Sequence, residues 1–379
     1  MSLIEQIRIE AARPMAEARA LPFGAYSDPE VFALETERIF QRDWVGLCAA
    51  AALPDPGDYF AFDLAGEPVV VLRGKDAELC ALSNVCRHRG TILLDPGMGN
   101  VSQLVCPYHA WSYDTKGKLK GIPYAGDVEI DREAHCLPQF QLEVWAGIIF
   151  INLDSDAAPL AQRLTGIDRY LGKFQIDRFE EAGNFLSWEW NANWKLIVEN
   201  AMDWYHVFRL HGETIEPFSA TKDSRYIEGS AAWSISASKL RPPIVKRPDH
   251  PNAFGEFELT GTPIFTIPPN LVSYLTADSW DWLAILPSAA DRCVVTWNSL
   301  RAPGTASIPA VSEYSASGVF DQLMEEDPLL CERVQRGMRA RHGKGGSLVS
   351  LDRPIADLHR YLGWRLFNTE PSKPWIAPE

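Results

Sequence analysis

The sequence lacks an excess of basic residues: its 36 Lys and Arg are outnumbered by 50 Asp and Glu, and the formal net charge over 379 residues is −14. A nucleic-acid partner is therefore not expected, because phosphate binding needs a basic face. The sequence also lacks an apolar run long enough to span a bilayer, since its longest candidate, WAGIIFINL, has the length of a strand. The N-terminus carries charge throughout and has no apolar core. We therefore expect no secretory signal, no membrane partner and a cytoplasmic protein.

Cysteines are few, and no glycine-rich dinucleotide-binding fingerprint is present. The seven cysteines are Cys48, Cys80, Cys86, Cys106, Cys136, Cys293 and Cys331. An odd number, scattered along a chain expected to be cytoplasmic, does not predict a disulfide framework. The missing fingerprint excludes a chain that binds its own nicotinamide cofactor.

The pattern of apolar residues predicts an α+β fold with two domains. Residues 1–44 read as a helical segment that packs on the larger domain. Residues 45–154 are short β-rich runs separated by Gly, Pro and Asp, which predicts a small all-β domain. Residues 155–379 begin with a helical stretch, are β-rich between 225 and 302, and close with two helices. This order predicts an antiparallel sheet capped by helices.

Two Cys-His pairs stand about twenty residues apart in the stretch NVCRHRGTILLDPGMGNVSQLVCPYHAWSY. They are Cys86 with His88 and Cys106 with His109, at the tips of two predicted hairpins. Two thiolates and two imidazoles suit either a tetrahedral zinc ion or a [2Fe–2S] cluster. Zinc sites usually pair Cys with Cys and His with His, whereas each loop here carries one of each. The spacing therefore favours the cluster.

This ordered quartet resembles the metal-binding motif of Rieske-type iron–sulfur proteins. The resemblance implies that Cys86 and Cys106 bind one iron of the cluster and that His88 and His109 bind the other. Trp111 follows the second pair and is expected to shield the cluster from water.

A second group of candidate ligands lies in the stretch ENAMDWYHVFRLHGE. His211 lies five positions after His206, which leaves the two histidines roughly 140° out of register on a regular helix. The helix must bulge or break for both to reach one ion, and a π-bulge is the usual device. Asp203 lies three residues before His206 and is placed to orient that imidazole. Two His with one distant carboxylate would form the facial triad of non-haem Fe(II) oxygenases.

With both groups in one chain, the sequence resembles the catalytic α subunit of Rieske non-haem iron oxygenases, the aromatic-ring-hydroxylating family, over nearly its whole length. The resemblance implies a third iron ligand on a late helix, which we assign to Asp327 in LMEEDPLLCERVQRG, with Glu325 and Glu326 as competitors. It also implies that Asp203 bridges the two metal centres across a subunit interface. Asn200 matches a residue near the iron pocket.

The resemblance also implies the reaction and the partners. We expect a terminal oxygenase with one [2Fe–2S] cluster and one mononuclear Fe(II). It would take O2, a small-molecule substrate, and electrons from NAD(P)H through a separate reductase or ferredoxin. A homotrimer is expected, and a β subunit is possible. The outcome is monohydroxylation, cis-dihydroxylation or oxidative demethylation.

The substrate is predicted from residues expected to line a pocket. These are Trp204, Tyr205, Phe208, Trp280 and Trp282. Aromatic walls suit a flat ring, and they equally suit a quaternary ammonium group held by cation–π contacts. Arg209 would bind a substrate carboxylate. The family resemblance implies an aromatic substrate rather than an amine, because the bridging residue is Asp203, as in the aromatic-ring hydroxylases, where many amine-oxidising members have Glu. We therefore expect hydroxylation of an aromatic, carboxylated molecule, with oxidation of a quaternary or methylated amine as the alternative.

Two other classes of protein remain open. One is a Rieske electron-transfer protein without oxygenase activity, which the His206 and His211 pair and the large second domain disfavour. The other is a zinc-stabilised ligand-binding protein. Visible colour separates these classes, because a Rieske protein is red-brown and a zinc protein is colourless.

Overall fold

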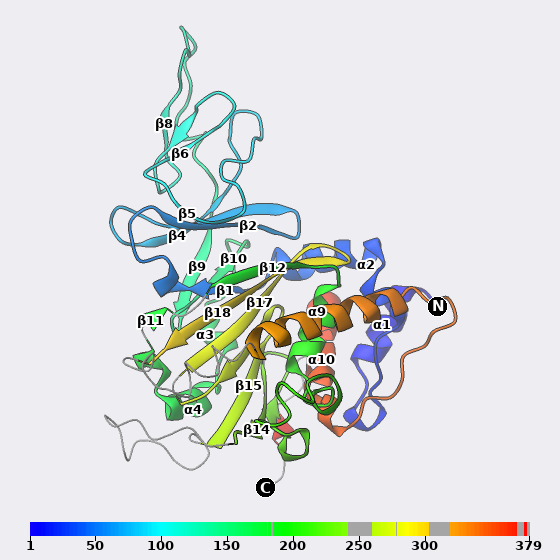
Figure 1. Cartoon of the computed structure of the whole chain (residues 1–379). Helices are drawn as coiled ribbons and strands as arrows, with labels where there is room; N and C mark the ends of the chain where they lie inside the picture. The colour runs from blue at the N-terminus through cyan, green and yellow to red at the C-terminus, as the bar shows by residue number, and fades with distance from the viewer. Residues whose placement is uncertain are drawn as a thin grey trace.

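Two large antiparallel sheets organise the chain, and Figure 1 shows one above the other. The computed structural model describes residues 1–179, 181–182, 185–241, 260–277, 279–302, 319–369 and 375–376. The predicted α+β class is confirmed: a strand-rich domain stands on a sheet that carries helices. Among the described residues, no helix is both long and apolar enough to cross a membrane.

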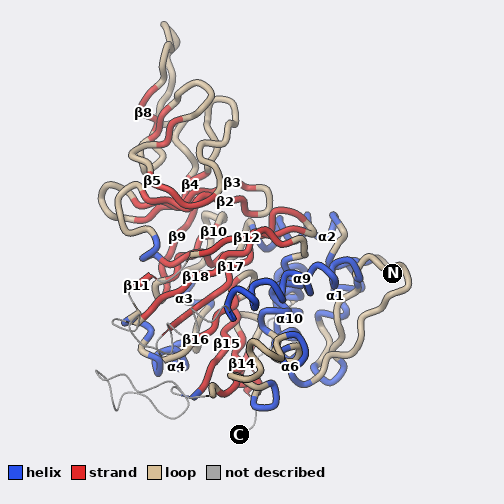
Figure 2. The backbone as a smooth tube through the Cα atoms, in the orientation of Figure 1, coloured by secondary structure: helices blue, strands red, loops and turns tan. Residues whose placement is uncertain are grey.

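The upper domain is built on a seven-stranded sheet in the order β1-β10-β9-β4-β3-β2-β5. Its strands are β1 (Val45–Ala49), β2 (Asp58–Leu64), β3 (Glu67–Arg73), β4 (Leu79–Ser83), β5 (Gly97–Asn100), β9 (Gln139–Trp145) and β10 (Ile148–Asn152). The middle of β3 is a run of valines, and β-branched residues of this kind pack well in a sheet. Between Asp58 and Trp145 the described chain is strand and loop (Figure 2).

The two Cys-His loops extend from this sheet at the top of the molecule. The first loop lies between β4 and β5. The second loop joins β6 (Leu104–Val105) to β7 (Ser112–Tyr113), which with β8 (Leu119–Gly121) form a small three-stranded sheet. The segment DTKGK, residues 114–118, forms a tight turn between β7 and β8, where Gly117 has a φ of +77°. Both loops therefore stand well away from the lower sheet (Figure 1).

The lower domain is built on a nine-stranded antiparallel sheet. Eight strands follow the order β11-β18-β17-β16-β15-β14-β13-β19, and β12 pairs with β18 as well. They are β11 (Glu181–Ala182), β12 (Leu186–Trp190), β13 (Arg225–Gly229), β14 (Ser234–Lys239), β15 (Gly261–Ile267), β16 (Leu271–Leu275), β17 (Ser279–Ala289), β18 (Arg292–Arg301) and β19 (Trp375–Ile376).

Helices cover both faces of the lower sheet. The main helical elements are α1 (Leu3–Ala11), α2 (Pro29–Glu35), the π-helical turn η3 (Thr36–Phe40), α3 (Leu160–Arg163), α4 (Asp168–Leu171), α5 (Trp194–Met202), α6 (Val207–Leu210), α9 (Val319–Gly337) and α10 (Arg353–Phe367). Figure 1 shows α1, α9 and α10 together on one side and α3 and α4 on the other. The predicted helix LAQRLTGIDRYLGKF is broken into the short helices α3 and α4, with Gly166 at a φ of +92° between them. The predicted late helix begins in residues 313–318, which lie outside the described residues.

The two faces of the lower sheet carry different cores. One core joins α5 and α10 to sheet residues such as Val272 and Leu283. The other joins α3 and α4 to sheet residues such as Trp280 and Trp282. Because successive residues of a strand point to opposite faces, Trp282 and Leu283 belong to opposite cores. Of the residues predicted to line a substrate pocket, only those on the face that packs against α5 can lie near the histidines.

The domains are joined at the strand β1. The Gly46 N–H donates to Asn270 Oδ1 at 3.0 Å, and Asn270 Nδ2 donates to the Gly46 carbonyl at 2.8 Å. A Cβ atom at Gly46 would lie 2.5 Å from the Leu271 side chain, so only glycine fits without a shift. β1 and β10 thus pack against the lower domain, and the boundary at 154 stays a prediction.

The N-terminal segment is fixed to α5 by a buried ion pair. Lys195 Nζ lies 2.6 Å from Glu35 Oε1, and each side chain is 1% exposed. Trp194 Nε1 donates to the second oxygen of Glu35 at 2.8 Å. Glu35 ends α2, where the helix widens into η3. A charged pair so far from water persists only when each charge has its partner.

We expect Lys195→Met to lower the free energy of unfolding by about 3–5 kcal/mol, because Glu35 would keep a buried charge without a cation. Chemical denaturation followed by circular dichroism measures this change. The double variant Lys195→Met, Glu35→Gln should be less destabilised than the single variant, since it leaves no unpaired charge. A double variant as unstable as the summed single variants would contradict this account. Lys222→Met, at an exposed lysine, is the control.

Candidate metal centres

The two Cys-His loops have the same backbone hydrogen bonds. The Cys86 N–H donates to the Thr91 carbonyl at 2.8 Å, and the Cys106 N–H donates to the Trp111 carbonyl at 2.8 Å. In each loop the residue four positions after the cysteine donates back to the cysteine carbonyl at 3.0 Å and has a positive φ. This residue is Gly90 in the first loop, which satisfies the left-handed conformation at little cost. The sequence thus builds two similar turns that present their side chains to each other.

The cysteines of these loops are buried and their sulfurs are surrounded by donors. Cys86 is 2% exposed and Cys106 is 3% exposed. Burial acts to raise the pKa of the Cys106 thiol, but backbone N–H groups of Tyr108 and His109 outweigh it and lower the pKa. The Tyr113 hydroxyl lies 3.4 Å from Cys86 Sγ. Such hydrogen bonds favour thiolates, the form that binds metal.

The histidines of the loops are exposed and lie beside each other. The ring centroids of His88 and His109 are 4.8 Å apart. His88 stacks on Trp111 with centroids 4.7 Å apart, and Trp111 is itself buried. Two buried sulfurs below two exposed imidazoles fit a [2Fe–2S] cluster with Cys on the inner iron and His on the outer iron. Trp111 lies against the His88 ring, and its shielding of the cluster stays a prediction.

The second group forms where the helix α5 ends. Asn193 caps its start by accepting from the Lys195 N–H, and Asp203 leaves the helix in an extended conformation. His206 and His211 flank the short helix α6. The chain is interrupted before His206, between α5 and α6, and the residues between the two histidines form one helical turn. The bulge or break expected between the histidines is therefore wrong.

The interruption before His206 brings both histidines to the late helix α9. One ligand atom each from His206, His211 and Asp327 lies within 4.8 Å of the others. Asp327 Oδ1 is 3.0 Å from His211 Nε2 and 3.9 Å from His206 Nε2. Pro328 follows Asp327 inside α9. The assigned acid, Asp327, is thus the one of the three candidates that faces both imidazoles.

The electrostatics of this site agree with a cation. Burial acts to raise the pKa of Asp327, but the hydrogen bond and charge of His211, with further help from His206 and Asn200, hold this pKa below its ordinary value. Burial acts to lower the pKa of His211, and Asp327 and Glu326 outweigh it and raise the pKa. Two imidazoles with one carboxylate are the donor set that mononuclear Fe(II) takes. The side chains therefore fit the implied iron.

The predicted bridging residue contacts the first histidine of the site. Asp203 Oδ2 lies 3.2 Å from His206 Nδ1, on the side of the ring away from Asp327. The other oxygen accepts from the Tyr205 N–H. The side chain of Asp203 is only 13% exposed, so little of its carboxylate is accessible to a further hydrogen-bond donor from outside the chain. Its role between centres stays a prediction.

Two residues predicted to line the pocket lie elsewhere. Trp280 and Trp282 do share a face of β17, but that face belongs to the core with α3 and α4. Both are 0% exposed, and Trp282 Nε1 donates to the Leu47 carbonyl at 2.7 Å. The prediction that they line a pocket beside the histidines is therefore wrong: the spacing indicated a shared face but not which one.

The predicted pocket residues next to the histidines differ in burial. Trp204 is buried, and its Nε1 donates to Ser236 Oγ at 3.1 Å on the sheet. Tyr205 and Phe208 are about half exposed, and Arg209 is exposed. An exposed arginine beside water is poorly placed to hold a substrate carboxylate, so the structure does not support that role for Arg209.

The sheet offers other aromatic side chains toward α5. The Tyr274 hydroxyl donates to the Ala201 carbonyl at 3.0 Å, and burial and the charge of Asp327 raise the pKa of this hydroxyl. The Trp297 ring stacks on Tyr274 with centroids 5.9 Å apart. Asp281 pairs with Tyr274 in the β16–β17 register and therefore shares its face. No distinctive spacing in the sequence marked these residues.

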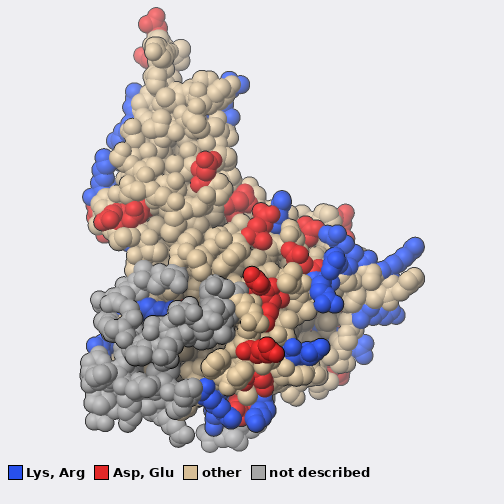
Figure 3. All heavy atoms as spheres, viewed as in Figure 1, with Lys and Arg blue, Asp and Glu red and all other residues tan. Residues whose placement is uncertain are grey.

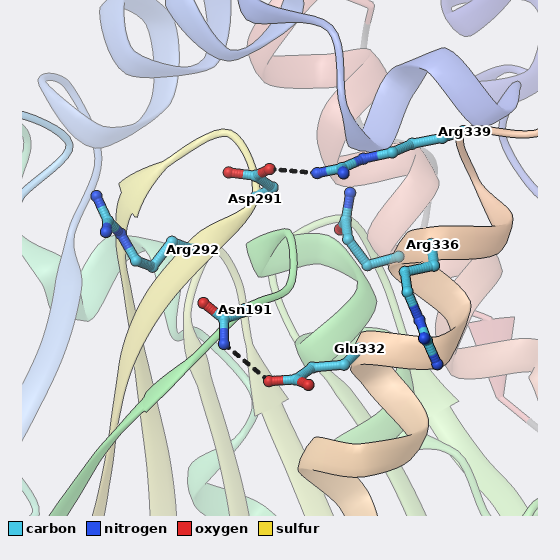
Figure 4. A pocket seen from close by; sticks show the side chains of 7 residues that line it. Asn191, Asp291, Arg292, Glu332, Arg336 and Arg339 are labelled. Atoms are coloured by element: carbon cyan, nitrogen blue, oxygen red, sulfur yellow. Dashed lines mark hydrogen bonds and ion pairs between the residues drawn. The ribbon is translucent and has the colours of Figure 1, made fainter.

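Two hollows on the surface do not belong to the site. The hollow in Figure 4 has a volume of about 420 Å³ and lies beside the C-terminal end of α9. Charged side chains line it, with Arg339 paired to Asp291 at 2.6 Å and Glu332 accepting from Asn191. A second hollow of about 620 Å³ lies beside Phe140. Neither contains a residue of the histidine site.

Sequence reasoning missed two residues that contact the ligand candidates. Tyr113 contacts Cys86, and Glu326, considered only as a competing ligand, contacts His211 Nδ1 at 2.7 Å. Tyr113 lies four residues after His109, and nothing else in the sequence distinguishes it. Glu326 directly precedes Asp327, and this adjacency was the one feature of the sequence that could have pointed to it.

The chain matches known families in both domains. Residues 174–367 match the family described as ring hydroxylating alpha subunit (catalytic domain), and residues 43–140 match the Rieske [2Fe-2S] domain. The first match covers more than half of the chain, which therefore belongs to this family. A [2Fe–2S] cluster and a mononuclear iron are thus the cofactors of its two domains.

Individual relatives differ in substrate. The glycine betaine monooxygenase oxygenase subunit of Chromohalobacter salexigens is 34% identical over 196 residues, 52% of this chain and 44% of the relative. The benzene 1,2-dioxygenase subunit alpha of Pseudomonas putida is 36% identical over 194 residues, 48% of this chain and 42% of the relative. A solved quaternary ammonium Rieske monooxygenase, studied for carnitine oxidation, has a TM-score of 0.80 and 25% identity and covers 94% of this chain and 97% of that one. The chain spans about half the length of the curated relatives it matches.

Proposed function

We propose that this chain is the oxygenase component of a Rieske monooxygenase that oxidises a small quaternary ammonium or methylated amine with O2. Electrons would come from NAD(P)H through a separate reductase or ferredoxin. The observation that carries the oxygenase assignment is the convergence of His206, His211 and Asp327 in a chain that also has the two Cys-His loops. Neither an electron carrier nor a protein stabilised by zinc at the Cys-His loops has a need for the second site.

In this proposal the three side chains hold Fe(II) from one side and leave positions open for O2. The iron supplies the oxygen chemistry, and the protein supplies position and electrons. Asn200 helps to lower the pKa of Asp327, which stabilises the charged form of this carboxylate beside the imidazoles. Asp203 holds His206 by the opposite ring nitrogen. The site therefore orients its ligands before substrate arrives.

The substrate class follows from relatives and from the sheet face beside α5. The glycine betaine relative and the structural similarity to a quaternary ammonium monooxygenase favour an ammonium substrate. Tyr274 and Trp297 offer aromatic surfaces to a cation, and Asp281 places a carboxylate on the same face. Asp281 also pairs with Arg301 at 3.1 Å, which leaves its charge partly balanced. We assign these three residues to substrate recognition within the proposal.

A second candidate is hydroxylation of an aromatic ring. The benzene dioxygenase relative supports it, as does the aspartate at position 203. The expected preference for an aromatic acid is not confirmed, because Arg209 is exposed and Trp280 and Trp282 face the other core. We therefore rank it second.

The test is substrate-dependent consumption of NADH and O2 by the iron-loaded chain with a surrogate reductase. The panel contains glycine betaine, carnitine, γ-butyrobetaine, benzoate and benzene, and products are identified by mass spectrometry. Formaldehyde or an aldehyde released from an ammonium compound supports the proposal. Oxygen inserted into an aromatic ring alone transfers the assignment to the second candidate. Uncoupled NADH oxidation with every compound contradicts both substrate classes.

A further inference from the structure

Two neighbouring acids of α9 contact the same imidazole at different nitrogens. Asp327 Oδ1 lies 3.0 Å from His211 Nε2, and Glu326 Oε2 lies 2.7 Å from His211 Nδ1. The lone pair or N–H of Nδ1 and that of Nε2 point in different directions from the imidazole ring. A metal held by Nε2 and Asp327 is therefore out of reach of Glu326, which excludes Glu326 as a competing ligand.

We propose that Glu326 is a positioning residue of the iron site, which fixes the orientation of His211 by accepting a hydrogen bond from its Nδ1–H. That bond keeps the proton on Nδ1 and leaves the Nε2 lone pair directed at the metal. Histidine ligands commonly donate their outer N–H to a carboxylate, and loss of such a partner weakens metal binding. The inference rests on the proposed iron site and is independent of the proposed substrate.

The surroundings of Glu326 hold its carboxylate in place. Thr214 Oγ1 donates to Glu326 Oε2 at 2.8 Å, and Gln322 Nε2 donates to Glu326 Oε1 at 2.9 Å. Thr214 is 0% exposed and His211 is 1% exposed, so water does not compete for the contacts on Oε2. Thr214 lies three residues after His211, and Gln322 lies four residues before Glu326 on α9. The carboxylate is thus held from two chain segments.

The arrangement is repeated at the other histidine. Asp203 Oδ2 lies 3.2 Å from His206 Nδ1, while His206 Nε2 faces Asp327. Each imidazole therefore has a carboxylate at Nδ1 and the shared Asp327 at Nε2. The contact of Glu326 is the shorter of the two and the histidine it holds is the more deeply buried. A buried ring with one fixed edge has little freedom to turn away from the metal.

The test measures Fe(II) affinity by competition with a coloured chelator, using the full chain with its Rieske cluster in place. We expect Glu326→Ala to weaken Fe(II) binding about 10–100-fold. Glu326→Gln keeps one acceptor oxygen but loses the charge, and should weaken Fe(II) binding less. Glu325→Gln is the matched control, because it removes an exposed carboxylate from the adjacent position of the same helix. It should bind Fe(II) as the unaltered chain does.

A general structural defect would give a different pattern. If Glu326 acts through His211, the variants keep their thermal unfolding midpoint and the visible spectrum of the Rieske cluster while Fe(II) affinity falls. Thr214→Val, which removes one donor to Glu326 but no carboxylate, should show a smaller loss of the same kind and serves where the Glu326 variants fold poorly. Unchanged Fe(II) affinity in Glu326→Gln or Thr214→Val, or an equal loss in Glu325→Gln, would overturn the proposal. None of these readouts requires the substrate to be known.

Discussion

Asp327→Ala is expected to abolish substrate-coupled O2 consumption, a loss of at least about 10³-fold. The reason is geometric: Asp327 Oδ1 is the acceptor that faces the Nε2 atoms of both His206 and His211. Without this carboxylate, two neutral imidazoles are left to hold a divalent cation. Iron content should fall from about three to about two atoms per chain, the two that remain being those of the cluster.

The Rieske cluster provides the internal control for this variant. Its loops lie in the upper domain, away from α9 (Figure 1), so the visible spectrum should not change. Glu325→Gln is the control on the same helix and should keep both iron content and activity. Retention of full iron content by Asp327→Ala would show that another group supplies the third ligand.

Much of the first metal centre could be predicted from the sequence because its parts are local. Cys86 and His88 share one loop, Cys106 and His109 share another, and the short turns fix how each pair is presented. The local structure of the second centre was less predictable. A bulge or break was expected between His206 and His211, but these residues flank one helical turn, and the chain is interrupted before His206, where Asp203 leaves α5.

The parts that required the structure depend on contacts between distant segments. Glu326 and Asp327 are adjacent in sequence, and which one faces the histidines depends on how α9 is rotated against α6. Trp280 and Trp282 were assigned to the wrong face because both faces of this sheet are buried, so consecutive positions of β17 such as Trp282 and Leu283 are both apolar and buried. A pattern of period two indicates which residues share a face, but the covering helices decide what that face contacts.

The surface around the two Rieske histidines has the composition of a protein contact. His88 and His109 are exposed, and three exposed apolar or aromatic side chains lie in or next to their loops: Ile92, Val105 and Tyr108. On the face in Figure 3, the upper domain carries few charged groups over most of its surface, whereas acidic and basic groups alternate lower down. Aromatic residues and arginine are enriched at protein contacts, and the exposed Arg87 and Arg89 flank His88. We propose a neighbouring subunit as the partner, in the homotrimer that the family resemblance implies.

Asp203→Asn is the variant that tests communication between the centres, and we expect it to slow turnover about 100-fold or more while about three iron atoms per chain are retained. Asn has nearly the same shape, but one of its two polar atoms is a donor. It can therefore satisfy His206 Nδ1 or a histidine of a neighbouring cluster, but it does not offer a carboxylate to both. In single-turnover mixing with O2 and substrate, the reduced Rieske cluster should stay reduced in this variant. Glu213→Gln, an exposed acid close to His211, should behave as the unaltered chain does.

Mixing two inactive variants determines whether this transfer crosses between subunits. A chain with His88→Ala lacks a functional cluster, and a chain with Asp327→Ala lacks the mononuclear iron. If the cluster of one subunit reduces the iron of its neighbour, mixed assemblies contain sites with one intact cluster facing one intact iron, and activity returns. Transfer within a single chain predicts no recovery at any ratio, because no chain in the mixture has both centres. Adding Asp203→Asn to the His88→Ala chain, which supplies the intact iron, should remove the recovered activity, while adding it to the Asp327→Ala chain should not.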